Sequence, residues 1–226
     1  MNICLLGNNL TNLVLAHTLL NKKINVDIVF ETQASFLQNT VRTIAISNEN
    51  YNFLRQNIKG LNNLGWPTEK IKIYSEKNKS SELFEFKNKN SNNFYLFKYQ
   101  DFFNLLKKNK LLKFIRLKNY NFETIKKRKY DLIINSDQNN QITKKFFQKK
   151  IVKNYKSLAH TAIINHKNIE NKTAMQIFTN NGPLAFLPFK HNQTSIVFSN
   201  NSEKLIDKKK FLEIINNYNN KYKITK

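Results

Sequence analysis

The chain has 226 residues, of which 38 are Lys or Arg and 15 are Asp or Glu, so its formal net charge is +23. Its 40% hydrophobic content is too high for a wholly disordered chain, and its 4 Gly and 1 Cys exclude collagen-like and disulfide-stapled classes. The sequence shows neither a run of the ~20 apolar residues that cross a bilayer nor a secretory signal. We therefore expect one soluble domain, or one and a fraction, in the reducing cytoplasm.

The positive charge raises the question of a nucleic-acid partner, because basic surfaces gain affinity by neutralising phosphates. Only 4 of the cationic residues are arginines, whose planar guanidinium suits base edges and bidentate phosphate contacts. The lysines are spread along the whole chain among Asn, Ile, Phe and Tyr, which are residue types with A/T-rich codons. Drift in base composition explains this charge without a nucleic-acid partner, and a functional basic patch remains the alternative.

Residues 1–31 read as a βαβ unit. Ile3–Leu6 is a short apolar run, which is typical of a strand buried on both faces. Leu10–Leu20 carries apolar residues at three- and four-residue spacings, which predicts an amphipathic helix with Asn9 as its N-cap. Val26–Phe30 is the second strand, so the unit is a parallel crossover.

The rest of the chain alternates between predicted helices and strands. We expect helices at 48–56, 100–108 and 204–218, and strands at 71–74, 83–86, 94–97, 130–135, 157–165, 174–178, 184–189 and 195–198. The last strands form a block without predicted helices between them. This order predicts an α/β protein with a Rossmann-like nucleotide-binding core and a second, antiparallel β-sheet layer.

The turn after the first strand is a candidate dinucleotide site. A pyrophosphate binds at a helix N-terminus, where backbone N–H groups and the helix dipole point at it. Of the fingerprint G-x-G-x-x-G, only Gly7 is present, with Asn9 and Asn12 in the other two positions. Glu31 ends the second strand, where a carboxylate binds ribose hydroxyls. Taken alone, this pattern fits an ordinary βαβ turn with a surface glutamate equally well.

Further segments along the chain extend the pattern. They are Arg42–Ser47, Phe53–Leu54, Leu64–Trp66, Asp131–Asp137, Tyr155–Ala159, Ala174–Phe178, Gly182–Pro188 and Ser195–Phe198. In this order and spacing they resemble the flavoprotein aromatic hydroxylases of ubiquinone biosynthesis, a branch of the para-hydroxybenzoate hydroxylase-like monooxygenases. The most specific part is 178–188 with the strand from Ser195.

The resemblance implies a set of FAD contacts. Gly7, with the positions now held by Asn9 and Asn12, matches the pyrophosphate turn, and Glu31 matches the acid on the adenosine ribose. Arg42 matches an arginine that lies along the cofactor in the family. Its alternative interpretation is an exposed loop arginine.

A second set of residues lies later in the chain. Asp137 matches the Asp of an Asp-Gly fingerprint that holds FAD and, in relatives, NAD(P)H, although Gln138 replaces the glycine, and Gln141 and Lys144 replace the usual Ser and Arg. The family's substrate lies against the sheet that matches Gly182, Pro183, Leu187 and Pro188. The alternative is a plain turn and strand pair. We assign no catalytic side chain, and the four histidines lack metal-ligand spacing.

The implied enzyme is an FAD-dependent monooxygenase that hydroxylates a polyprenylated phenol in the cytoplasm, with peripheral membrane contact and NAD(P)H as reductant. Its domains would be 1–154 for FAD, with 71–98 contributing strands to the second layer, and 155–226 as the start of the substrate sheet. Family members continue beyond the position of Lys226 with a further FAD segment. We therefore expect an uncovered apolar face on the helix at 205–215.

Three interpretations remain open from the sequence. The chain is the FAD-dependent monooxygenase itself, or a fragment or decayed copy of it whose missing C-terminal part a partner chain supplies. It is a non-catalytic accessory protein that keeps the fold and packs on a partner chain. Or it is a basic nucleic-acid-binding module, although drift in base composition already accounts for the positive charge.

Overall fold

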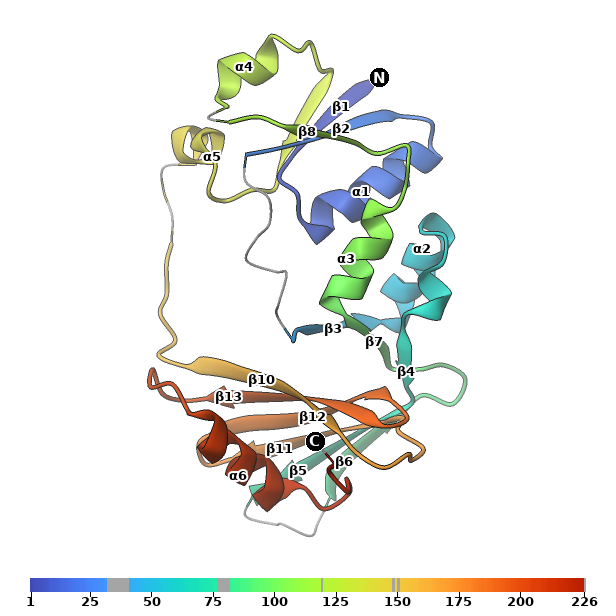
Figure 1. The fold of residues 1–226 in the computed structure, drawn as a ribbon, viewed down its shortest axis with the longest axis vertical. Helices are drawn as coiled ribbons and strands as arrows, with labels where there is room; N and C mark the ends of the chain where they lie inside the picture. The colour runs from blue at the N-terminus through green and yellow to red at the C-terminus, as the bar shows by residue number, and fades with distance from the viewer. Residues whose placement is uncertain (32–40, 77–81, 119, 148, 150, 226) are drawn as a thin grey trace. The chain divides into compact units, whose positions relative to one another are not determined.

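The computed structural model describes residues 1–226 except 32–40, 77–81, 119, 148, 150 and 226 (Figure 1). The chain divides into two compact units. The first unit comprises Met1–Thr40, Asn52–Leu64 and Tyr99–Val152, and the second comprises Val41–Tyr51, Gly65–Lys98 and Lys153–Lys226. The chain therefore crosses between the units several times, and the segment 65–98 belongs with the C-terminal part.

The first unit contains a four-stranded parallel sheet. In spatial order its strands are β8 (Lys113–Arg116), β2 (Asn25–Phe30), β1 (Asn2–Leu6) and β9 (Leu132–Asn135). Its helices are α1 (Leu10–Asn21), α3 (Tyr99–Lys107), α4 (Phe122–Lys126) and α5 (Gln141–Phe146), and α2 (Asn48–Asn57) and a 3-10 helix (Leu61–Asn63) belong to it in whole or in part. The predicted βαβ unit is confirmed.

Strand β1 lies at the centre of this unit. Cys4, Leu5 and Leu6 have no exposed surface, as expected for a strand covered on both faces. Helix α1 buries Leu13 and Ala16. The core thus fixes the carboxyl end of β1 and the start of α1 relative to each other.

The second unit contains two sheets. The larger has the order β10 (Leu158–Asn165), β13 (Gln193–Asn200), β12 (Gly182–Lys190), β11 (Thr173–Thr179), β5 (Lys70–Ser75) and β6 (Glu82–Lys87). All neighbours are antiparallel except β11 and β5. The smaller has the order β3 (Thr43–Ser47), β7 (Phe94–Lys98) and β4 (Trp66–Thr68). The α/β class with a second, largely antiparallel layer is confirmed.

Helix α6 (Lys208–Tyr218) covers one face of the larger sheet. Phe211 is 8% exposed and Ile215 is fully buried, because they pack with the sheet's inward-facing residues. The expectation of an uncovered apolar face on this helix is therefore wrong at these positions. Leu205 and Leu212, 85% and 42% exposed, stay at the surface. The helix begins later than predicted because Asp207 is its N-cap.

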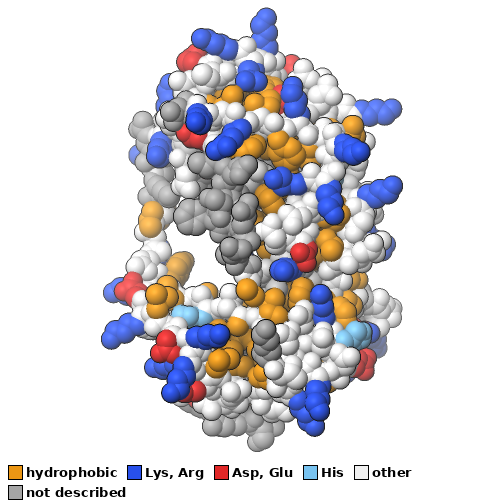
Figure 2. Space-filling model, viewed as in Figure 1, with side chains coloured by type: hydrophobic (Ala, Val, Ile, Leu, Met, Phe, Trp, Pro, Cys, Tyr) orange, Lys and Arg blue, Asp and Glu red, His pale blue; other side chains and the backbone are white. Residues whose placement is uncertain are grey.

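The Lys and Arg side chains are spread over the surface, as they are along the sequence. Figure 2 shows Lys and Arg side chains spread over the visible face of both units rather than gathered in one place. Among the described residues, no helix combines the length and apolarity that crossing a bilayer requires.

Candidate functional site

The carboxyl edge of the parallel sheet brings the predicted cofactor residues of the first unit together. Strand β1 pairs with β2 on one side and β9 on the other. In open α/β sheets, ligands bind outside the carboxyl ends of the strands where the strand order reverses. The residues that follow β1, β2 and β9 at this edge are Gly7, Glu31 and Ser136.

Gly7 occupies a backbone conformation and a space that both require glycine. Its φ is +110°, a conformation that L side chains rarely adopt. A Cβ at this position would lie 3.0 Å from Asp137 Cβ and 3.2 Å from Asn9 Nδ2. The Gly7 N–H donates to Val29 O at 2.8 Å. The turn after β1 therefore lies directly against Asp137, the residue that the resemblance assigns to a separate fingerprint.

Asn9 begins α1. Its Oδ1 accepts a hydrogen bond from Asn12 N at 3.0 Å, and its Nδ2 donates to Ser136 Oγ at 2.8 Å. Within the described part of the chain, the N–H groups of Leu10 and Thr11 have no acceptor. Helix N-termini of this kind attract anions, since the first N–H groups lack intrahelical partners and the dipole is positive there. The turn keeps an anion-binding geometry with only one glycine.

Asn12 fills the place of the third fingerprint glycine. It is fully buried, and its Nδ2 donates to Leu6 O at 2.8 Å and to Gly7 O at 2.7 Å. The amide thus joins helix to strand by hydrogen bonds, where glycine would allow direct contact. Asn12 Oδ1 and Asn8 Oδ1 are buried without a partner in the described residues. Buried polar atoms of this kind call for a water or ligand partner.

The end of β9 carries a polar turn in place of the Asp-Gly fingerprint. Asp137 N donates to Asn135 Oδ1 at 3.1 Å, and Asp137 Oδ1 accepts from Asn139 N at 2.9 Å. Thr143 Oγ1 donates to Asp137 O at 2.6 Å. Gln138 is absent from the positive-φ residues, so its position does not require glycine. The turn is built by hydrogen bonds that sequence reasoning missed.

The two remaining predicted FAD contacts lie in different units. Glu31 directly follows β2, and its carbonyl oxygen accepts from Arg116 Nε at 3.4 Å. Arg42 precedes β3 in the second unit and is exposed. Its contact with a cofactor stays a prediction.

The predicted substrate segment is strand β12. Burial alternates along it: Leu184 and Phe186 belong to the core with α6, whereas Pro183 and Leu187 are half-buried. Gly182 has φ +125°, and a Cβ there would lie 1.9 Å from Ser199 O, so its requirement for glycine is structural. Pro188 is buried, at the bulge in the pairing with β13. The substrate roles of these residues stay predictions.

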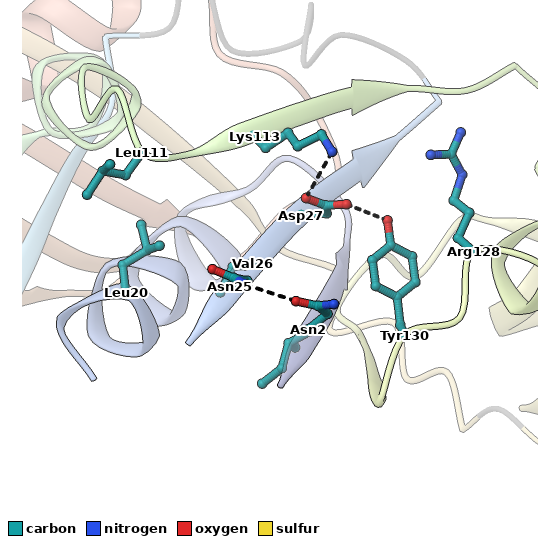
Figure 3. A pocket seen from close by; sticks show the side chains of 10 residues that line it. Asn2, Leu20, Asn25, Val26, Asp27, Leu111, Lys113, Arg128 and Tyr130 are labelled. Carbon is teal, nitrogen blue, oxygen red and sulfur yellow. Dashed lines mark hydrogen bonds and ion pairs between the residues drawn. The ribbon is translucent and has the colours of Figure 1, made fainter. Parts of the chain in front are cut away.

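A cavity of about 490 Å³ opens at the amino edge of the same parallel sheet (Figure 3). Tyr130 Oη donates to Asp27 Oδ2 at 2.7 Å, and Lys113 Nζ lies 3.9 Å from Asp27 Oδ1. Burial, and then the hydrogen bond to Asp27, raise the pKa of Tyr130 above its usual range. Because this edge lies opposite Gly7, the cavity is separate from the cofactor residues. No sequence motif marks it.

The described residues hold no cluster of three or more His, Cys, Asp or Glu side chains that fits a metal ion. No protein-family model and no curated protein sequence matches the chain.

Comparison with solved structures gives the fold. The chain is similar to Klebsiella pneumoniae HpxO in complex with FAD and uric acid, with a TM-score of 0.66, 9% identity, and coverage of 96% of this chain and 61% of that one. It is similar to p-nitrophenol 4-monooxygenase PnpA from Pseudomonas putida (TM-score 0.67, 8% identity, 96% and 61% covered). It is also similar to 2,6-dihydroxypyridine-3-hydroxylase from Arthrobacter nicotinovorans, with a TM-score of 0.60, 11% identity, and coverage of 88% of this chain and 55% of that one. The chain has the fold of FAD-dependent monooxygenases and spans about three fifths of their length.

Proposed function

We propose that this chain is the cofactor- and substrate-sheet part of an FAD-dependent monooxygenase that hydroxylates a phenolic ring. The observation that carries the proposal is the packing of Asp137 against Gly7, beside the start of α1 in a monooxygenase fold. A Cβ added at Gly7 would lie 3.0 Å from Asp137 Cβ. Two fingerprint positions 130 residues apart in the chain thus meet at the edge of the sheet where a dinucleotide binds in such folds.

The residues present fit the cofactor. Gly7 and the N–H groups of Leu10 and Thr11 would hold the pyrophosphate, and Glu31 would hold the adenosine ribose. Asn12 does not obstruct the turn, because its side chain is directed back to Leu6 O and Gly7 O. When bound, FAD supplies the oxygen chemistry, with NAD(P)H as the proposed reductant.

The role proposed for the second unit is to bind the ring and exclude water. Pro183 and Leu187 share a half-buried apolar face of β12 with Ala185, away from α6. Such a face suits an aromatic substrate, which needs apolar area more than charged partners. For Arg42 we propose a contact with the cofactor on the resemblance alone.

We also propose the finer assignment to ubiquinone biosynthesis, with a polyprenylated phenol as substrate and peripheral contact with the membrane. What supports it is the series of segments from Arg42 to Phe198 that resembles this branch of the family. Since the chain spans about three fifths of the length of its structural neighbours, we propose that a partner chain supplies the remaining flavin contacts. Binding of a 2-prenylphenol, but not of phenol, to the FAD-loaded chain would support this assignment, and equal affinities would contradict it.

The test of cofactor binding compares two glycine variants. Gly7→Ala adds a Cβ in the proposed site, whereas Gly60→Ala is a matched control with φ +84° in the same unit and a nearest neighbour at 3.5 Å. FAD titration is followed by the visible flavin spectrum and by quenching of flavin fluorescence. We expect the wild type and Gly60→Ala to bind FAD, and Gly7→Ala to bind at least about tenfold more weakly.

A folded wild-type chain that leaves the flavin spectrum unchanged at excess FAD would overturn the proposal. Circular dichroism of each variant establishes folding. That outcome would favour the non-catalytic accessory protein. Binding to duplex DNA that falls steeply as salt rises would instead favour the nucleic-acid module.

A further inference from the structure

Strand β6 is an exposed edge of the larger sheet. In the described part of the chain it pairs only with β5, and all six of its residues are exposed. Phe84 and Phe86 are 62% and 51% exposed, although large apolar side chains are usually buried. An edge strand presents a row of open backbone N–H and C=O groups that can pair with another chain.

Every second residue of β6 has its backbone groups directed away from β5. Hydrogen-bonding direction alternates along a strand, so neighbouring residues of β6 direct their N–H and C=O groups in turn to β5 and to the open edge. The open edge therefore offers backbone donors and acceptors along the whole strand.

The two faces of β6 differ in chemistry. One face is apolar, with Phe84 and Phe86 opposite Ile73 and Ile71. On the other face, Lys72 Nζ lies 2.6 Å from Glu82 Oε2 and 3.1 Å from Glu85 Oε2.

The charged face also carries two lysines in opposed positions. Lys70 and Lys87 stand directly opposite each other, and neither has an ion pair in the described residues. Like charges in directly opposed positions destabilise a sheet. A carboxylate arriving from beyond the open edge would relieve this repulsion.

We propose that β6 pairs antiparallel with β6 of a second copy of this chain, about a two-fold axis at Phe86. This register places Glu85 of each copy opposite Lys87 of the other. Phe86 meets Phe86 of the second copy on the apolar face. Moving the axis to Glu85 would oppose two glutamates instead, so charge selects the register.

The interface is self-complementary, as a two-fold contact requires. It joins the two larger sheets at 85–87 and covers the C-terminal half of an edge that would otherwise invite uncontrolled pairing. The net charge of +23 on each copy opposes association at low salt. At ~0.15 M salt the screening length is about 8 Å, so short-range pairing across the edge outweighs that repulsion.

Light scattering after size exclusion tests the proposal at 0.15 M salt and about 100 μM chain. We expect a wild-type dimer. Lys87→Glu and Glu85→Lys each place like charges in opposition, so each alone should associate at least about tenfold more weakly. Mixed one to one, they should form a heterodimer, because both cross-strand pairs are then opposite in sign.

Lys118→Glu, an exposed site in the first unit, makes the same charge change as Lys87→Glu and should leave the dimer intact. Circular dichroism establishes that each variant is folded. A monomeric wild type, or a mixture of the two variants that stays monomeric, would overturn the proposal. A monomer that binds phosphatidylglycerol vesicles through Phe84 and Phe86 would overturn it too, by assigning the apolar face to a lipid surface.

Discussion

The Asn9 side chain donates a hydrogen bond from Nδ2 to Ser136 Oγ at 2.8 Å, across 127 residues of sequence. The contact joins the turn after β1 to the first residue after β9. Asn9 also caps α1 through Oδ1. Asn9, which stands where the fingerprint has a glycine, therefore contributes hydrogen bonds of its own. The turn is rebuilt with asparagine amides, and glycine is kept only at Gly7.

Replacement of Asn9 by glycine should cost little stability. Glycine is an acceptable N-cap, a few tenths of a kcal/mol below asparagine, and a typical hydrogen bond contributes about 0.5–1.5 kcal/mol. We expect Asn9→Gly to lower the free energy of unfolding by about 1 kcal/mol in urea titrations. A cycle with Ser136→Ala measures the contact itself. Additive losses within about 0.3 kcal/mol would mean that the hydrogen bond adds nothing.

Replacement of Asn12 should cost more. Its amide satisfies two carbonyl oxygens in a fully buried position, and leaving buried polar groups unpaired costs about 1–3 kcal/mol. We expect Asn12→Ala to lower the free energy of unfolding by that amount. Asn12→Gly, which restores the fingerprint, adds about 1 kcal/mol for glycine in a helix. The control is Asn104→Ala on the exposed side of α3, expected to change stability by less than about 0.5 kcal/mol. Equal losses in the free energy of unfolding for Asn12→Ala and Asn104→Ala would contradict the role of Asn12 in joining α1 to β1.

Replacement of Gly182 should lower the stability of the fold rather than weaken substrate binding. Gly182→Ala combines a positive φ with a Cβ that would lie 1.9 Å from Ser199 O, and a backbone atom yields less readily than a side chain. We expect the free energy of unfolding to fall by at least about 3 kcal/mol. Gly60→Ala, with positive φ but an open surrounding, should lose about 1–2 kcal/mol. An unchanged thermal midpoint in Gly182→Ala would show that the strand has room to shift.

The residue pattern predicts the elements that hold several apolar residues. Strand β1 is predicted by its apolar run, which is buried, whereas α1 buries Asn12 and His17 beside Leu13 and Ala16, so its apolar spacing marks the buried face only in part. Strand β8 was missed, since as an edge strand it holds only Phe114 and Ile115 between charged residues. Strand β3 has no prediction of its own from the residue pattern, and its residues enter only through the resemblance. Short strands with one or two apolar residues stand out too little from loops, whereas β5 and β6 hold several and are predicted although they are half-buried and exposed.

The candidate site was predictable residue by residue but not as an arrangement. Gly7 and Asp137 each have a sequence signal, yet their contact depends on the parallel register of β1 with β9, which no local pattern encodes. The hydrogen bonds of Asn12 reach only five and six residues back along the chain, but a fingerprint that requires glycine at this position gives no signal for them. The cavity with Asp27 and Tyr130 had no signal, because residues at the starts of parallel strands belong to no motif.

Cys4 should report on unfolding at alkaline pH. It is fully buried in β1, and desolvation, followed by the nearby charge of Asp27, raises its pKa from an ordinary value of about 9 to about 12. Below pH 9 the thiol is protonated in both states, so its contribution to stability is fully present. Above pH 9 only the unfolded chain ionises, and the contribution is lost as the pH rises towards 12.

The expected size follows from the same linkage. At pH 10 the free energy of unfolding should be lower by about 1.4 kcal/mol through Cys4 alone. Cys4→Ala should remove this part of the pH dependence, whatever its effect at neutral pH, while the part due to buried Tyr120, whose pKa burial raises to about 12, persists. A thiol reagent at pH 8 provides a second measurement: Cys4 should react only at the rate of unfolding, because its thiolate is disfavoured and its sulfur is inaccessible. Rapid labelling of the folded chain, or a Cys4→Ala variant with the wild-type alkaline slope, would contradict this assignment.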